Sequence, residues 1–508
     1  MEQQASIRQI TQTTQAGQAA QTRSQKQKST IYRWVRLFFT EDISPDNHRL
    51  IDLQRRACWI GIALMLQGLN ELSHVDYIPH PQPYDSLASF LLLVGSLYAI
   101  WMALRPEKLK QQAHVAQGNP RRWQQRTLLL IIIEAVIGSF LFGYIIGMCF
   151  LPPMMANDGT SLDTNAAILL TQGRNPYTDS NIIDVERRFA IQPDWTTPLR
   201  VGQFADQLDY PTLKQLYTIF DADLKAGQAP EFESKVSYPA LSFLILVPFA
   251  FLKDYNVLPF FLLCYLLLVA IAWKVTRPEL RPWVLLLALA NIPMWSSVYG
   301  SNLDIFIILL IVLAWLLRHH RWSSALFFGL ALAGKQTAWF LIPFYLILIY
   351  RQYGWKEALG RMSIASGVFL LINLPFMLWN FHAWLVGIMA PVADPMFPMG
   401  VGIIALSVIH LLPYFPTWFY SGLEAGAMLA MFVCYWSLCR KRPQAALLFA
   451  MLPLFLAWRS LPSYFYCIAY PIFIFLAARP SGGEVGLRSL QFPALARPQP
   501  TLSNNTLQ

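Results

Sequence analysis

The stretch from Asn157 to Tyr177, NDGTSLDTNAAILLTQGRNPY, follows an apolar run that ends near Leu151. It places two carboxylates, Asp158 and Asp163, within about two helical turns of the end of that run. Each can have an ordinary structural role, because an Asp here can cap a helix or lie in a solvated loop. A polar, acidic segment directly after a membrane helix is also a suitable place for chemistry on a membrane-delivered substrate. The function then depends on which other polar residues converge on this stretch.

Hydrophobic residues make up 55% of the 508 residues, and charged residues only 13%. Soluble domains carry about 25% charged residues, so the composition predicts an all-α polytopic membrane protein. The formal net charge of +10 comes from Lys and Arg clusters between apolar runs. That pattern marks cytoplasmic loops, so nucleic acid is not an expected partner. The six cysteines include no Cys-x-x-Cys pair, so neither a disulfide framework nor a thiolate metal site is expected.

The composition changes along the chain predict four segments. Residues 1–50 are expected to form a disordered cytoplasmic tail and its lead-in, and residues 51–126 two transmembrane helices and a basic cytoplasmic loop. Residues 127–478 are expected to form the main transmembrane domain, with an extracytoplasmic loop at residues 152–236. Residues 479–508 are expected to form a disordered C-terminal tail.

The basic clusters also predict the topology. Clusters near residues 274–281, 318–321, 351–361 and 440–442 all fall on the cytoplasmic side only if the Pro-containing run Tyr238–Leu252 is broken or re-entrant. The apolar runs then predict a bundle of about 12 to 14 transmembrane helices. In the outer loop, residues 204–226 are expected to form an amphipathic helix at the membrane surface, and residues 401–413 a second partial helix on the same side.

Under this topology a set of polar residues lies at the outer ends of the spans, on the same side as Asp158 and Asp163. A charge at membrane level costs about 2.5 kcal/mol or more, so such residues usually pair or carry a function. Structural roles compete with a functional one: helix capping for the Asn and Asp residues, snorkelling for Lys and Arg, and an interfacial imidazole for His. The set is Asn302, Asp304, Lys335, His382, Asp394 and Arg459.

Short motifs within residues 127–478 carry a family resemblance. The first reads A-A-x-x-L-x-x-G-x-N-P-Y and ends at Asn175, Pro176 and Tyr177. Others are Tyr238 and Pro239, the Gly-x-x-x-Asp of residues 300–304, the Lys-Gln at residue 335, and residues 459–465. The chain resembles the GT-C class of integral membrane glycosyltransferases, and within it the polyprenol-phosphate-mannose-dependent glycosyltransferase family 87.

The resemblance implies a GT-C-like bundle in which a polyprenyl-phosphate-linked hexose, expected to be mannose, is transferred with inversion to a lipid or glycan acceptor. The reaction would take place at the extracytoplasmic face of the cell membrane. Asp158 is then the first candidate for the general base and Asp163 the second, with Lys335 and Arg459 binding the donor phosphate. Asn175, Tyr177, Asn302, Asp304 and His382 are candidate substrate-binding residues.

No cofactor and no metal are expected, because the leaving group is a phosphate monoester with cationic partners. Apart from substrates, the expected partners are the membrane lipids. Two further functions compete with the transferase: a polytopic transporter or lipid flippase, and a non-catalytic scaffold. The long acidic outer loop and the lack of a visible internal repeat favour the transferase over the transporter.

Overall fold

The computed structural model describes residues 37–39, 48–73, 83–105, 122–152 and 157–479. Helices dominate these residues, together with one sheet of two short parallel strands. The expectation of an all-α membrane protein is confirmed at this level. The tails expected at residues 1–50 and 479–508 lie almost entirely outside the described residues.

Five helices in the described part of the chain are long and apolar enough to cross a membrane. A sixth span is obtained if the bent pair Pro278–Leu289 and Ile292–Tyr299, which meet at 54°, counts as one. Shorter apolar helices lie beside them, so the expected number of about 12 to 14 spans stays a prediction. The five long helices are α3 (Pro83–Leu104), α4 (Arg122–Met148), α11 (Leu258–Val275), α17 (Trp355–Trp379) and α20 (Thr417–Leu438).

The remaining helices of the bundle are shorter or more polar. Pro at the first or second position begins several of them, where its missing N–H costs nothing. They are α2 (His48–Ser73), η5 (Pro278–Leu280), α12 (Arg281–Leu289), α13 (Ile292–Tyr299), α14 (Asp304–Leu316), α15 (Arg321–Gly334), η6 (Gln336–Leu341), α16 (Ile342–Tyr353), α18 (Phe381–Ala393), α19 (Ile404–Val408), α21 (Ala445–Met451), η7 (Leu452–Leu456), α22 (Ser463–Tyr466) and α23 (Ala469–Ala477).

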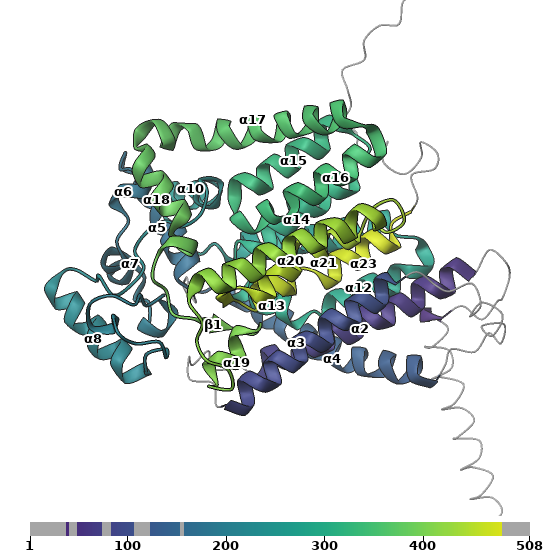
Figure 1. The fold of residues 1–508 in the computed structure, drawn as a ribbon, viewed down its shortest axis with the longest axis horizontal. Coiled ribbons are helices and arrows are strands. Elements are labelled where there is room, and N and C mark those ends of the chain that lie inside the picture. The colour runs from purple at the N-terminus through teal and green to yellow at the C-terminus, as the bar shows by residue number, and fades with distance from the viewer. Residues whose placement is uncertain (1–36, 40–47, 74–82, 106–121, 153–156, 480–508) are drawn as a thin grey trace, which may run out of the picture.

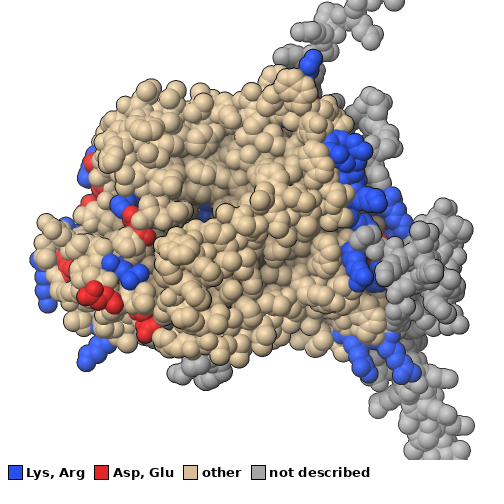
Figure 2. All heavy atoms as spheres, in the orientation of Figure 1, with Lys and Arg blue, Asp and Glu red and all other residues tan. Residues whose placement is uncertain are grey.

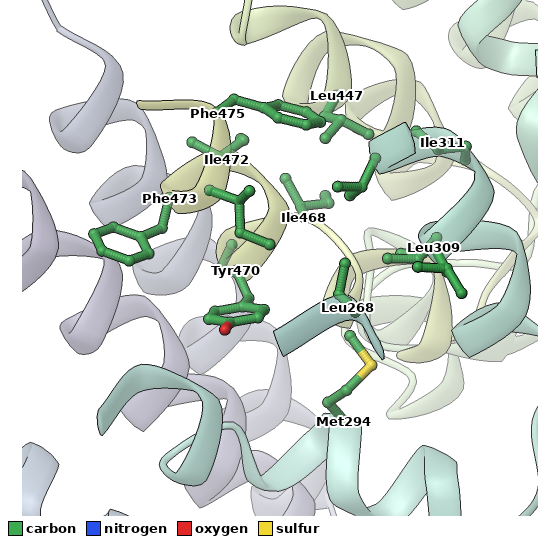
Figure 3. Close-up of a cluster of buried hydrophobic side chains, with 14 of the residues drawn as sticks. Leu268, Met294, Leu309, Ile311, Leu447, Ile468, Tyr470, Ile472, Phe473 and Phe475 are labelled. Atoms are coloured by element: carbon green, nitrogen blue, oxygen red, sulfur yellow. The ribbon is translucent and has the colours of Figure 1, made fainter. Parts of the chain in front are cut away.

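The centre of the bundle is a continuous apolar core. Figure 3 shows side chains from α11, α13, α14, α21 and α23 meeting there, among them Leu268, Met294 and Tyr470. The Tyr470 hydroxyl, buried in this core, donates to the carbonyl of Val284 at 3.2 Å, so its polar group is satisfied. Because lipid surrounds the bundle, this core depends on close packing more than on exclusion of water.

The outer loop folds as a small unit of its own. Figure 1 shows it at one end of the molecule, next to α5. Its helices are α5 (Asp158–Thr171), α6 (Pro176–Asp179), α7 (Ile182–Phe189), η3 (Pro193–Trp195), η4 (Gly202–Phe204) and α8 (Leu213–Ala226). Their apolar side chains, including Ile182, Phe204 and Phe220, form a separate buried cluster with Phe232 and Phe397. The loop therefore has its own hydrophobic core.

The amphipathic helix expected at residues 204–226 is shorter and differently placed. It begins at Leu213 because Thr212 caps it: the Thr212 hydroxyl accepts a hydrogen bond from the Gln215 amide. Pro211 precedes this cap and disfavours a helical conformation before it. Its apolar side chains Leu216 and Phe220 pack into the core of the loop. The apolar face of α8 is thus used inside the loop and not at the membrane surface.

The expected interruption of Tyr238–Leu252 is present. The segment forms only α9 (Leu241–Leu244) and α10 (Val247–Leu252), two short helices separated by two residues. A short helix, α19, also lies within residues 401–413, as expected for a partial helix. α9 and α10 pack against α5, and α19 packs against α3 and the strand that follows α18.

Two strands bring distant parts of the chain together at this end. β1 (Met399–Gly400) pairs in parallel with β2 (Arg459–Ser460). Gly400 has a φ of +135°, and a Cβ there would overlap the Ser460 carbonyl oxygen. Only glycine permits this approach. The pairing fixes the position of Arg459.

Charged side chains are distributed differently at the two ends of the molecule. Figure 2 shows Lys and Arg side chains gathered at the end where α2 begins and α3 ends, while acidic and basic side chains mix at the outer-loop end. The surface between the two ends is almost free of charge in this view, as expected for the part that lies in lipid. This arrangement agrees with a cytoplasmic end that is basic and an outer end that carries the acids.

Candidate functional site

The first turn of α5 docks directly on the turn between α13 and α14. Asn157 caps α5 by accepting the Thr160 amide, and its own amide group donates to the Gly300 carbonyl at 2.6 Å. The Thr160 hydroxyl donates to the Ser301 carbonyl at 2.9 Å. Ser301 has a φ of 54°, a left-handed conformation that turns these carbonyls toward α5. The first turn of α5, which carries Asp158, is thereby held against the turn that leads to Asn302 and α14.

Asp158 lies at the first position of α5, half-buried, with both carboxylate oxygens engaged. One oxygen accepts the Gly159 amide at 2.8 Å, and the other accepts the hydroxyl of Thr197 from the far side of the outer loop. A helix N-terminus favours the ionised carboxylate. Asp158 is therefore fixed in orientation and still within reach of the solvent.

Asp163 lies inside α5 and is only 3% exposed. One of its oxygens accepts the Ser242 hydroxyl at 2.9 Å. Burial raises the pKa of Asp163 to about 7, while the Ser242 hydrogen bond and the Lys335 charge act in the opposite direction. The alternative that Asp163 caps a helix is wrong, because Asn157 fills that role six residues earlier.

Lys335 forms a buried ion pair with Asp304, with 2.7 Å between the ammonium nitrogen and a carboxylate oxygen. Both side chains are 9% exposed. Lys335 interrupts the helical region between α15 and η6, and Asp304 lies in the first turn of α14. Snorkelling of Lys335 to the interface is excluded, since its charge is neutralised inside the protein.

Tyr238 lies between these charges. The Lys335 ammonium is 5.0 Å from the centre of the Tyr238 ring and lowers the pKa of its phenol. Desolvation and nearby carboxylates raise the same pKa, and the net value is about 12. The carboxylates that act on this phenol are those of Asp304, Asp163 and Asp158. One ring therefore lies within electrostatic range of all three acids.

The Asn-Pro-Tyr block holds the backbone of Tyr238 in place. Asn175 caps α6 by accepting the Tyr177 amide at 3.0 Å, and the Tyr177 hydroxyl donates to the Tyr238 carbonyl at 2.8 Å. Both side chains are buried. The structure thus places Asn175 and Tyr177 as supports of the site and not on a cavity wall.

Two cavities meet at the ion pair. A polar cavity is bounded by Asp163, Ser242, Asn302 and Lys335. An apolar cavity includes Asp304, the partner of Lys335, on its wall. The apolar cavity is otherwise formed by side chains of α14, η6, α21 and α22, including Tyr464, and by the two residues 467 and 468 that follow α22.

Arg459 approaches the same region from β2. Its guanidinium, half-buried, forms no hydrogen bond or ion pair with a described residue. Desolvation raises the pKa of the Tyr210 phenol, the Arg459 charge lowers it, and the Asp158 charge adds to the rise. Tyr464 lies within electrostatic range of both Arg459 and Lys335. Arg459 is therefore a cation near the site whose charge no described acid neutralises by direct contact.

The remaining predicted residues divide between the site and its surroundings. Asn302 lines the polar cavity. His382 is exposed on α18 and lines neither cavity. Asp394 pairs with Lys235 at 2.5 Å and ties the end of α18 to the outer loop. Among the described residues, no group of three or more His, Cys, Asp or Glu is placed to hold a metal ion.

Sequence reasoning missed Thr197, Ser242, Tyr210 and Tyr464 as parts of the site. Thr and Ser carry no pattern that distinguishes a carboxylate partner from any other loop or helix residue. Tyr464 lay within the segment 459–465 that carries part of the resemblance, but its position in space depends on the packing of α22. Contacts between segments far apart in sequence are invisible without the fold.

These features define a class of protein: an integral membrane protein with a charged site at one end of an apolar bundle. The family model described as Glycosyltransferase family 87 matches residues 237–462, a little under half of the chain. The chain resembles this family over the part that contains Tyr238, Asp304, Lys335 and Arg459, which supports a membrane glycosyltransferase. The Asn-Pro-Tyr block lies outside the matched range. Comparison with curated proteins and with solved structures gives no match.

The ion pair predicts a charge-rescue experiment. Asp304→Asn leaves the Lys335 ammonium buried without its partner and should lower the free energy of unfolding by about 3–5 kcal/mol. The double variant Asp304→Asn with Lys335→Met removes both charges and should recover most of that loss. Thermal unfolding of the purified proteins in detergent measures both. Equal losses in the single and double variants would mean that the pair is not what stabilises this region.

Asp163 predicts a pH dependence of stability. Its pKa is raised from 3.8 to about 7, so the folded protein favours the protonated acid. The stabilisation is complete below about pH 4 and is lost as the pH rises to about 7, and it amounts to a few kcal/mol at about 1.4 kcal/mol per pKa unit. Asp163→Asn should remove this dependence. As the pH increases from 4 to 7, the melting temperature of the variant should therefore rise relative to that of the wild type.

The exposed acid Asp206 provides the control for this experiment. Asp206→Asn should follow the wild-type melting temperature across the same pH range, because its side chain lies on the surface of the outer loop. A constant offset between Asp163→Asn and the wild type at every pH would show that Asp163 does not titrate in this range.

Proposed function

We propose that the protein transfers a hexose from a polyprenyl-phosphate-linked donor to a lipid or glycan acceptor at the extracytoplasmic face of the membrane. The family resemblance supports the class of reaction, and mannose is the sugar expected from that family. The observation that carries the proposal is the meeting of a polar and an apolar cavity at the buried ion pair of Lys335 with Asp304, with Asn157 and Gly159, the chain neighbours of Asp158, on the polar wall. An inverting transfer needs a base for the acceptor hydroxyl and a cation for the departing phosphate, and Asp158 and Arg459 are the residues that we assign to these roles.

The division of the site into polar and apolar parts supports a lipid-linked donor. The apolar cavity beside Asp304 adjoins the polar cavity that holds Asp163 and Lys335. Figure 2 shows a hollow in the uncharged face, between α17 and α18 on one side and α20 on the other, with a Lys or Arg side chain visible at its bottom. An amphiphilic donor fits such a hollow, with its chain along the apolar wall and its phosphate at the cation.

The chemical step follows from these positions. The acceptor hydroxyl oxygen forms a bond to the anomeric carbon while its proton passes to the Asp158 carboxylate. The bond between the anomeric carbon and the phosphate oxygen breaks on the opposite face, and its electron pair leaves with the lipid phosphate. Arg459 offsets the charge that grows on that phosphate. We assign Lys335 a smaller share of this work, because Asp304 already neutralises its ammonium.

Asp158 is the preferred base and Asp163 the alternative. Asp158 is half-buried and is oriented by two hydrogen bonds. Its charge and that of Arg459 both act on the pKa of the Tyr210 phenol. Asp163 lines the polar cavity, and its pKa of about 7 suits a base, but its side chain is almost fully buried. Accessibility to an acceptor from the aqueous side therefore favours Asp158.

The proposal predicts the behaviour of Asp158→Asn. Loss of the base should reduce transfer of labelled hexose from a synthetic polyprenyl phosphate by about 10²- to 10⁴-fold, with folding intact. The assay uses purified protein and an extract of membrane lipids and glycans as acceptor. Asp206→Asn, an exposed acid of the same loop, is the matched control and should transfer normally. A wild-type protein that forms no new glycosidic bond would instead support a transporter, and loss only in Asp163→Asn would move the base.

Arg459 predicts a separate effect on the donor. Arg459→Ala should raise the KM for the donor by about 10- to 100-fold, because hydrogen bonds to a charged group contribute about 1.5–3 kcal/mol. Steady-state kinetics with varied donor concentration measure this. Arg174→Ala, an exposed cation paired with Asp179, should leave the KM unchanged. A KM that does not change in Arg459→Ala would remove Arg459 from the donor site.

A further inference from the structure

The carboxylate of Asp158 is connected to a part of the chain that has no motif of its own. The hydroxyl of Thr197, on a loop 39 residues later, donates to one Asp158 oxygen. The Gly159 amide donates to the second oxygen at 2.8 Å. A carboxylate offers about four lone-pair positions, so both oxygens keep room for a further hydrogen bond. Rotation of the carboxylate is prevented while its ability to accept a proton is retained.

Thr197 is itself held firmly by the backbone of the outer loop. Its carbonyl accepts the Glu233 amide at 2.8 Å, and two residues later the Leu199 amide donates to the Glu231 carbonyl at 2.8 Å. The pair Pro198 and Phe232 forms an antiparallel bridge between these hydrogen bonds. The pairing of these two segments therefore fixes the position of Thr197 relative to Asp158.

A third segment braces this arrangement from the bundle side. The Arg200 amide donates to the Pro395 carbonyl at 2.6 Å, and Leu199 bridges to Met396. Next to it, the ion pair of Lys235 with Asp394 joins the outer loop to the same end of α18. The position of the Thr197 hydroxyl is thus determined by its own loop, by residues 231–233 and by residues 394–396.

We infer that Thr197 is a positioning residue for Asp158, holding the carboxylate in the orientation in which it takes the proton of the acceptor hydroxyl. The inference rests on the proposed function. In the transfer step the acceptor O–H bond breaks and the proton moves to an Asp158 oxygen, so a wrong rotation of the carboxylate lowers the rate even when both substrates bind. Thr197 touches neither substrate, and its effect acts through Asp158 alone.

The test separates the hydroxyl from the shape of the side chain. Thr197→Val keeps the shape and removes the hydroxyl, so kcat should fall by about 10- to 100-fold while the donor KM and the melting temperature stay near the wild-type values. Thr197→Ser keeps the hydroxyl and should restore most of kcat. Both are measured with the full-length protein in the hexose-transfer assay, alongside thermal unfolding.

Thr196→Val is the neighbouring control. The Thr196 hydroxyl donates to the Pro193 carbonyl at 2.5 Å and makes no contact with Asp158, so this variant should keep its kcat. Normal kcat in Thr197→Val, with Asp158→Asn inactive, would overturn the inference and leave the proposed function standing. Loss in both Thr197→Val and Thr197→Ser together with a lower melting temperature would overturn it as well, because the role would be structural. Normal transfer by Asp158→Asn with loss in Asp163→Asn would move the base and overturn this inference alone, whereas normal transfer by both variants would overturn the proposed function.

Discussion

The hydrogen bonds from the first turn of α5 to the turn at Gly300 and Ser301 hold the site together. Asn157 and Thr160 reach carbonyls that lie more than 140 residues later, and they do so at the outer end of the bundle. They fix the first turn of α5 beside the turn that leads to Asp304. Apolar packing continues this contact further along α5, because Ala167 and Ile168 belong to the main core of the bundle and Ala166 packs in a cluster with Phe243.

The two acids of α5 differ because their surroundings differ. Asp158 lies at a helix N-terminus and accepts hydrogen bonds from an amide and a hydroxyl, so both of its carboxylate oxygens are held in place. Asp163 is about one and a half turns further along, enclosed by the bundle, and burial raises its pKa to about 7. The cations divide in the same way. Lys335 is neutralised by Asp304 at 2.7 Å, while the Arg459 guanidinium forms no ion pair with a described acid.

The sequence was sufficient to predict the class of fold and the interrupted segment, but not the contacts between individual side chains. Composition and basic clusters predicted a helical membrane protein, and Pro239 and Pro248 made the interruption of Tyr238–Leu252 visible. Of the polar residues placed at outer span ends, Asn302 and Lys335 line the polar cavity together with Asp163, whereas His382 and Asp394 lie outside it. The pairing of Lys335 with Asp304 and the hydrogen bond from Thr197 to Asp158 depend on how separate segments pack, which no local pattern reveals. The expected course of α8 was wrong because the loop has a core that composition does not reveal.

The core of the outer loop is completed by Phe397, which packs against Phe204 with 5.9 Å between the ring centres. The rest of that core comes from residues 162–232. During synthesis the loop is therefore made long before its last aromatic ring. Its core is completed only after α17 and α18 have been made, so the final folding of this unit depends on the later helices of the bundle.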